Sequence, residues 1–244
     1  MKTATRWTLV LTMFAAPLFG RSEEITADRV VALADAVRNP QEDYQVTAIV
    51  SDFSPSAKEP RRAGYQIWVR GREKSVVRTA FPAVERGKSL LMLGRNLWII
   101  IPGTSQPIRV SFQQRLMGEV ANGDLSRANF SGDYKAEFLE ITDAYYRLQL
   151  MAKSDDVTYH KILFWVEKKK YTPMKAEFYS ISGRHLKTVT YEGYSRLGGR
   201  LRPTRHVIES ATVRGQKSII DFSDMKVGPV DEKYFNKTYL RKMS

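Results

Sequence analysis

The chain has 244 residues, of which 43% are hydrophobic and 27% are charged, and its formal net charge at pH 7 is +13. It contains no cysteine, which excludes disulfide bonds, thiolate metal ligands, a cysteine nucleophile and a lipid-modified N-terminal cysteine. The basic residues are dispersed over predicted turns and outward strand faces. This distribution favours a solvated surface, and its functional alternative is attraction to an anionic membrane surface or an acidic partner.

Residues 1–20 have the pattern of a signal peptide. Lys2 and Arg6 precede a mostly apolar run that is too short to span a bilayer, and Gly20 is suited to the cleavage site. The alternative is a buried N-terminal helix. We expect cleavage near Gly20, export to the periplasm, and a mature chain, residues 21–244, that forms a single domain. A chain exported in this way is not expected to bind nucleic acid.

The next part of the chain predicts one helix and three strands. Apolar residues fall on one face of a helix over residues 25–37, with Thr26 as the candidate cap. The hydrophobic period then changes to two, which predicts strands over residues 44–53, 64–70 and 74–81.

The central segment departs from this alternation. Strands are predicted over residues 88–93 and 97–101, and the second is apolar on both faces, so both faces should be covered. A short strand over residues 108–110 leads into residues 111–117 and 123–130, whose hydrophobic period is helical. We therefore predict a curved sheet whose concave side is capped by helices, with room for an apolar ligand.

Alternation resumes after this segment and predicts an antiparallel meander that ends in a short helix. The predicted strands span residues 135–142, 145–152, 159–167, 173–180, 185–194, 200–210 and 216–227, and the helix spans residues 231–242.

The sequence lacks the usual signs of catalysis. His160, His185 and His206 are far apart and do not have metal-ligand spacing, and there is neither a Gly-x-Ser-x-Gly elbow nor a phosphate-binding glycine loop. We predict no catalytic residue, no cofactor and no metal site. An enzyme that acts on lipids is an alternative that requires a polar triad inside the pocket.

Two groups of residues carry a family resemblance. The first comprises Glu85-Arg86-Gly87-Lys88, Gly94-Arg95-Asn96-Leu97-Trp98, Pro102, Ile108-Arg109-Val110-Ser111, Gln114-Arg115-Leu116-Met117-Gly118 and Gly123-Asp124-Leu125; the second comprises Val230-Asp231-Glu232-Lys233-Tyr234-Phe235 and Tyr239-Leu240. In their order and spacing, the chain resembles the LolA-like family of periplasmic proteins that sort outer-membrane lipoproteins or carry lipids. The resemblance implies a mostly β fold, an unclosed half-barrel of curved antiparallel sheet, with acyl chains bound between the sheet and a helical lid.

Six large apolar side chains are suitable by type for such a pocket. They are Trp68, Trp98, Ile100, Leu116, Met117 and Phe164. A methionine suits an adaptable pocket because its side chain is flexible and polarizable, although each of the six is equally suited to an ordinary core.

The expected function is that of a soluble, monomeric periplasmic carrier for lipid or lipoprotein acyl chains. Its expected partners are an inner-membrane transporter or an outer-membrane acceptor. The alternative is an accessory subunit of an envelope transporter that uses the same fold mainly to bind a protein.

Overall fold

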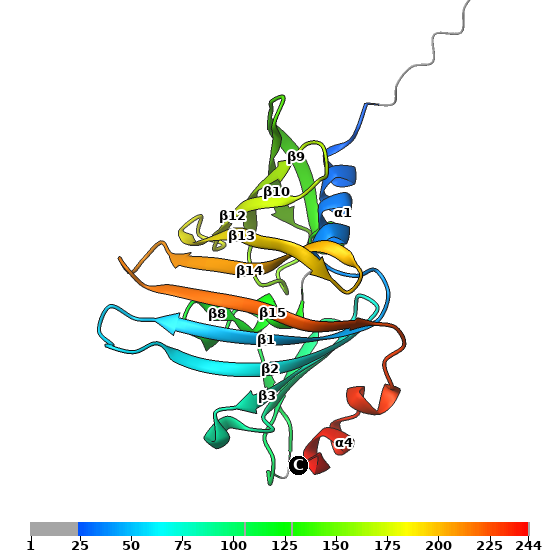
Figure 1. The fold of residues 1–244 in the computed structure, drawn as a ribbon, viewed down its shortest axis with the longest axis vertical. Helices are drawn as coiled ribbons and strands as arrows, with labels where there is room; N and C mark the ends of the chain where they lie inside the picture. Colours follow the sequence, from blue (N-terminus) through cyan, green and yellow to red (C-terminus); the bar gives the residue numbers. More distant parts are fainter. Residues whose placement is uncertain (1–23, 105, 128, 244) are drawn as a thin grey trace, which may run out of the picture.

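The computed structural model describes residues 24–104, 106–127 and 129–243, so the predicted signal peptide lies outside the described residues. Thirteen antiparallel strands form one sheet with β6 and β9 at its two edges. The chain starts near the middle of the sheet, at β1, and builds outward to β6. It then starts again at the opposite edge, β9, and returns inward until β15 pairs with β1 (Figure 1).

The strands follow the alternating segments of the sequence. The first half of the sheet consists of β1 (Tyr44–Phe53), β2 (Arg61–Arg70), β3 (Lys74–Phe81), β4 (Ser89–Leu93), β5 (Asn96–Ile100) and β6 (Ile108–Val110). The second half consists of β9 (Tyr134–Ile141), β10 (Tyr145–Ala152), β11 (Lys161–Glu167), β12 (Pro173–Tyr179), β13 (His185–Leu197), β14 (Arg200–Ser210) and β15 (Lys217–Val227). Every predicted strand is present, with its ends shifted by a few residues at most.

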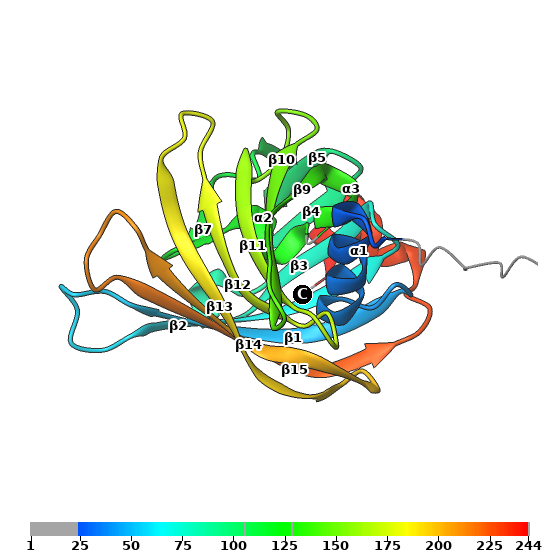
Figure 2. The same ribbon diagram turned by 90° about the horizontal axis from the view of Figure 1, so that it is seen from above.

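The sheet is strongly curved and does not close. Its edge strands β6 and β9 are not hydrogen-bonded to each other, and the strands curve around the helices α1, α2 and α3 (Figure 2). Here α1 spans Ala27–Arg38, α2 spans Asn122–Ser126 and α3 spans Phe130–Asp133. The expected unclosed half-barrel with helices on its concave face is therefore confirmed.

Helix α1 (Ala27–Arg38) begins where the sequence predicts. The Thr26 hydroxyl accepts a hydrogen bond from the Arg29 backbone N–H at 3.2 Å, which satisfies one of the free donors of the first turn. Val30 and Ala34 are fully buried in the core that the helix shares with the sheet. The Asp28 carboxylate accepts from the Ala136 backbone N–H at 2.9 Å and so joins the helix to edge strand β9.

Residues 111–117, predicted as helix, are instead a turn followed by a strand. The side chains of Ser111 and Gln114 each accept a hydrogen bond from the other's backbone N–H at 3.3 Å, which is how a helix often starts. The chain then forms β7 (Arg115–Met117), which pairs with β8 (Val120–Ala121) in a small hairpin. Gly118 makes the turn with a φ of +55°, a left-handed conformation that glycine adopts readily. The hairpin, rather than a helix, therefore faces the sheet here.

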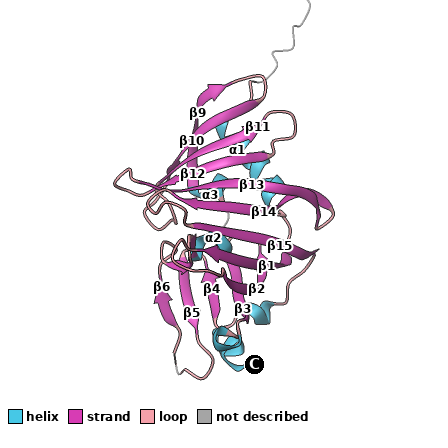
Figure 3. Cartoon of the chain, turned by 60° about the vertical axis from the view of Figure 1, so that its left-hand side comes forward, coloured by secondary structure: helices cyan, strands magenta, loops and turns pink. Residues whose placement is uncertain are grey.

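The C-terminal segment covers the other face of the sheet (Figure 3). It forms two short helices, η2 (Glu232–Phe235) and α4 (Lys237–Lys242), instead of the single predicted helix. Asn236 separates them, and its side-chain oxygen accepts from the first backbone N–H groups of α4 at 2.9 and 3.0 Å. Phe235 and Leu240 bury a second apolar cluster with residues of β2 to β5. Both faces of β5 are thus covered, as its composition predicts.

Candidate functional site

A cavity of about 690 Å³ lies between the concave face of the first half of the sheet and the β7–β8 hairpin. Successive strands of the sheet contribute its apolar wall: Ala63, Tyr65, Val77, Leu90, Ile99 and Val110. Burial and, secondly, the charge of Glu85 raise the pKa of Tyr65 to about 12, so its phenol stays neutral. The volume and the apolar wall are those of a site for a small amphiphile or an acyl chain.

The β7–β8 hairpin forms the opposite wall through Leu116 and Met117. Its turn is held against β1 and β15 because Gly118 packs directly on Asp52, where a Cβ atom would lie 2.0 Å from the carboxylate. Asp52 is 1% exposed and accepts from the Ser218 hydroxyl at 3.0 Å. The same hydroxyl accepts from the backbone N–H that follows the turn, also at 3.0 Å. These contacts fix the wall without filling the space in front of it.

The structure brings only part of the predicted pocket together. Leu116 and Met117 line the cavity, and both remain partly exposed. Phe164 lies on the concave side but belongs to the second half of the sheet, where it is fully buried against the rings of Phe130 and Tyr191. It packs as a core residue away from the cavity wall.

Trp68, Trp98 and Ile100 face the other side of the sheet. Trp68 stacks on Tyr234 at 4.7 Å, Ile100 belongs to the cluster under the C-terminal segment, and Lys237 lies 3.5 Å from the centre of the Trp98 ring. Successive side chains of a strand point to opposite faces, so it is their neighbours that line the cavity. We therefore do not assign these three residues to the pocket.

Sequence reasoning missed several cavity residues, and one of them, Ile99, lies between two residues that it chose. Ile99 follows Trp98 in β5, and Leu90 lies in β4, which is apolar throughout its central part. Tyr65 and Val77 stand on the same face of β2 and β3. In β2, the cationic residue at the start of the strand could have identified the cavity face, because Arg61, Ala63 and Tyr65 lie on the same face.

A buried polar group anchors α2 beneath the second half of the sheet. The Lys187 ammonium, from β13, is paired with the Asp124 carboxylate and donates to the Glu119 carbonyl oxygen at 2.8 Å. The Tyr159 hydroxyl donates to the same carboxylate at 2.8 Å. Burial and the nearby Asp124 charge raise the pKa of Tyr159 well above its usual value. Residues 119–124, which include β8 and the start of α2, are therefore held at both ends by Lys187.

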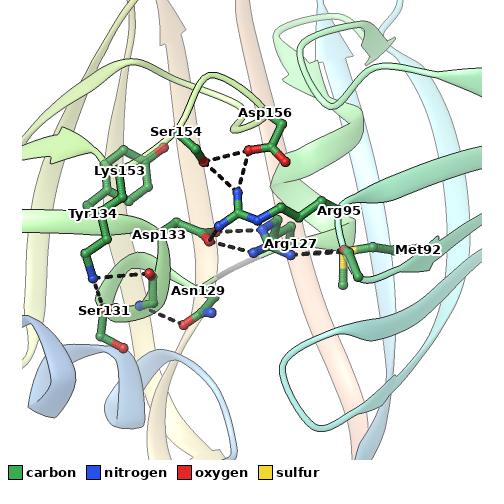
Figure 4. Close-up of polar contacts among 12 residues, drawn as sticks. Met92, Arg95, Arg127, Asn129, Ser131, Asp133, Tyr134, Lys153, Ser154 and Asp156 are labelled. Carbon is green, nitrogen blue, oxygen red and sulfur yellow. Dashed lines mark hydrogen bonds and ion pairs between the residues drawn. The ribbon is translucent and has the colours of Figure 1, made fainter.

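Charged side chains also join the two halves of the sheet across its opening (Figure 4). Arg95, in the β4–β5 turn, donates to Ser154 at 2.6 Å and to Asp156 at 2.5 Å, both in the β10–β11 loop. Arg127, just after α2, donates to both carboxylate oxygens of Asp133 at 2.6 and 2.5 Å. We call Arg95, Arg127, Asp133 and Asp156 the edge clasp.

The two ion pairs of the edge clasp differ in burial. The side chains of Arg127 and Asp133 are 4% and 5% exposed, whereas those of Arg95 and Asp156 are 42% and 43% exposed. Burial alone would lower the pKa of Arg127, but its hydrogen bonds to Asp133 and the carboxylate charge hold that pKa above its usual value. The hydrogen bond from Ser154, together with Arg95, lowers the pKa of Asp156. Arg127 and Asp156 are therefore both charged at neutral pH.

A second hollow, of about 80 Å³, lies beneath α1 and α3. The Arg38 guanidinium packs 3.7 Å from the centre of the Phe130 ring, and the His206 ring lies between those of Tyr191 and Phe222 at 4.9 Å from each. Burial and the charges of Arg38 and Lys187 lower the pKa of His206 to about 3. A space of this size holds a few water molecules, so this region is packing rather than a ligand site.

The described residues contain neither a metal site nor a membrane-crossing helix. Among residues 24–104, 106–127 and 129–243, no three His, Asp or Glu side chains are placed to hold a metal ion. In the same described part of the chain, no helix is both long and apolar enough to cross a membrane.

Comparisons with known proteins match this chain to a family model, to a relative with 44% identity and to more distant structures of the same fold. A family model described as an uncharacterized protein matches residues 71–242, and the comparison with curated proteins finds no match. The chain is 44% identical to a LolA superfamily protein, NE2245, from Nitrosomonas europaea, with a TM-score of 0.83 over 88% of this chain and 100% of that chain.

Two more distant structures share the fold. A putative outer membrane lipoprotein-sorting protein domain from Vibrio parahaemolyticus is 21% identical, with a TM-score of 0.72 over 88% of this chain and 98% of that one. A DUF1329 family protein from Desulfovibrio piger is 18% identical, with a TM-score of 0.75 over 88% of this chain and 97% of that one.

Proposed function

This chain belongs to the LolA superfamily, and on that premise we propose that it is a periplasmic carrier that binds lipid or lipoprotein acyl chains. The observation that carries the proposal is the cavity of about 690 Å³, with apolar side chains from five strands on one side and Leu116 and Met117 on the other. Each methylene that such a wall removes from water contributes roughly 0.8 kcal/mol, so an acyl chain can bind without a specific polar contact.

The proposed carrier acts outside the cytoplasm and has no catalytic step. The basic and apolar pattern of residues 1–20 supports export, with cleavage after Gly20 leaving residues 21–244 as one soluble domain. Among the described residues, those that line the cavity include no histidine, and the Ser89 hydroxyl among them donates to the Gly87 carbonyl oxygen at 3.0 Å. Such a wall supports binding rather than nucleophilic chemistry.

The test is a lipid-binding measurement on protein stripped of co-purified lipid. We expect 11-(dansylamino)undecanoic acid to bind the wild type saturably, with a rise in dansyl emission. Met117→Asp should weaken binding by about tenfold or more, because a carboxylate without a partner in an apolar wall costs more than an unpaired neutral polar group. Its melting temperature should stay close to that of the wild type, since the carboxylate reaches water in the empty cavity.

Met174→Asp is the matched control, because Met174 is 43% exposed on β12 and does not line the cavity. This variant should bind the probe as the wild type does. If the stripped wild type shows no saturable binding, the carrier proposal is refuted and the accessory-subunit alternative gains support. Unfolding of Met117→Asp would instead identify Met117 as a core residue.

A further inference from the structure

Four cationic side chains line the cavity, and three of them, Arg61, Arg62 and Arg115, are exposed. We call this charged, solvent-facing part of the lining the mouth. Arg61 and Arg62 begin β2, Lys88 directly precedes β4, and Arg115 begins β7. Glu85 is the one carboxylate among the described residues that line the cavity. The cations at the mouth therefore come from three separate parts of the chain.

The polarity changes from charged to apolar along single strands. Arg61, Ala63 and Tyr65 share the cavity face of β2, and Lys88 and Leu90 share that of β4. Residues two apart on a strand are separated by about 7 Å, so each charge lies about one side chain's length outside the apolar wall. This order, cation outside and hydrocarbon inside, is complementary to an amphiphile with an anionic head.

Three of the four cations have a carboxylate partner, but these pairs leave donors unused. Arg61 contacts Asp52 at 2.7 Å and Arg115 contacts Glu119 at 3.3 Å, in each case through one terminal nitrogen. The two carboxylates are nearly buried, whereas the Arg61 and Arg115 side chains are 71% and 65% exposed. A guanidinium has five N–H donors, so neither ion pair occupies all the donors of its arginine.

The other two cations, Lys88 and Arg62, have no buried carboxylate as a partner. Lys88 pairs with the exposed Glu85 at 2.6 Å, a contact of the kind that contributes little to stability. Arg62 is exposed and makes no ion pair with any described residue. A phosphate group, with several acceptor oxygens, matches the forked donors of arginine better than a neutral head does.

We propose that the carrier selects amphiphiles with a phosphate head, held by Arg61, Arg62, Lys88 and Arg115 while the acyl chain lies in the cavity. This inference rests on the proposed function, because it takes acyl binding as given and adds the class of head group. A free phosphate compound has the same head chemistry, and the experiment must distinguish the two sources.

The experiment compares three probes by calorimetry at low salt: 1-palmitoyl lysophosphatidic acid, 1-monopalmitoylglycerol and glycerol 3-phosphate. The first two share the chain and the first and third share the phosphate. We expect lysophosphatidic acid to bind the wild type at least about tenfold more tightly than either of the others, since it combines charge-assisted hydrogen bonds to the phosphate with burial of the chain. Added salt should weaken only the binding of the phosphate compounds.

Arg62→Gln/Lys88→Gln is the test variant, because neither residue is paired with a buried carboxylate. It should lose about tenfold in affinity for lysophosphatidic acid and keep its affinity for monopalmitoylglycerol. The control, Arg72→Gln/Arg196→Gln, removes two exposed arginines that do not line the cavity and should change neither affinity.

The outcomes separate the two proposals. Equal binding of both lipids by the wild type, or an unchanged preference in the test variant, overturns the head-group inference and leaves the carrier in place. Binding of neither lipid overturns the carrier itself. Glycerol 3-phosphate binding as tightly as lysophosphatidic acid shows an anion site without a chain site, and it contradicts both proposals.

Discussion

Arg127→Met tests whether the buried half of the edge clasp stabilises the half-barrel. The substitution keeps a long side chain but removes two short hydrogen bonds to Asp133 and one of 3.2 Å to the Gly94 carbonyl oxygen. The Asp133 carboxylate, 5% exposed, is then left with Arg95 at 3.9 Å as its nearest cation. Breaking a buried pair on one side typically costs about 3–5 kcal/mol, because an uncompensated charge stays buried.

The assay is urea unfolding of residues 21–244, with the midpoint and slope compared between variants. For a chain of this size the expected loss corresponds to a fall in melting temperature of roughly 6–20 °C. Arg127→Met/Asp133→Leu should recover most of that loss, since neither charge then remains buried. Arg95→Met should cost about 1 kcal/mol or less, because its ion pair with Asp156 is partly exposed.

Two results would refute this reasoning. One is a loss of less than about 1 kcal/mol in Arg127→Met, which would mean that the carboxylate finds water or another donor. The other is a double variant no more stable than Arg127→Met, which would mean that packing around the side chains, rather than charge, sets the cost.

Two other measurements address the buried histidine and the N-terminus. With the pKa of His206 lowered to about 3, the unfolded chain binds a proton between about pH 6.5 and 3 that the folded chain does not, so stability falls with falling pH. Wild type should lose about 1–2 kcal/mol more than His206→Phe between pH 7 and pH 5, as urea midpoints would show; parallel losses would contradict this assignment. For export, the mass of protein from its native host should correspond to residues 21–244, and an intact Met1 in most molecules would contradict cleavage near Gly20.

The strands could be predicted because alternation and turn residues are local signals. In β10 and β11 every second residue is buried, so two-residue periodicity alone locates them. The helix predicted over residues 111–117 was wrong for a non-local reason. Arg115 and Met117 pair with β8, and Gly118 fits only against Asp52, which lies far away in sequence. The capping residues at 111 and 114 are local signals, so they could not indicate that the strand pairing would replace the helix.

The candidate site was predicted only in part because β5 is apolar on both faces. Its sequence, Asn96 to Ile100, does not show which residues face the cavity and which face the C-terminal segment. The choice depends on Leu240 and Phe235, which arrive more than a hundred residues later. Trp98 has suitable chemistry for a pocket but faces away from the cavity. Met117 has suitable chemistry and lines the cavity.

The position of β1 between β2 and β15 has a consequence for the order in which the chain folds. Ala48 pairs with Tyr65 on one side and with Phe222 on the other, so the centre of the sheet is finished by almost the last strand to be synthesised. Until then β1 has an open edge, and β2 to β5 lack the apolar cover that Leu240 provides. Pairings this distant in sequence form slowly. The two meanders can therefore form from neighbouring strands, but they are joined into one sheet only when β15, near the end of the chain, pairs with β1.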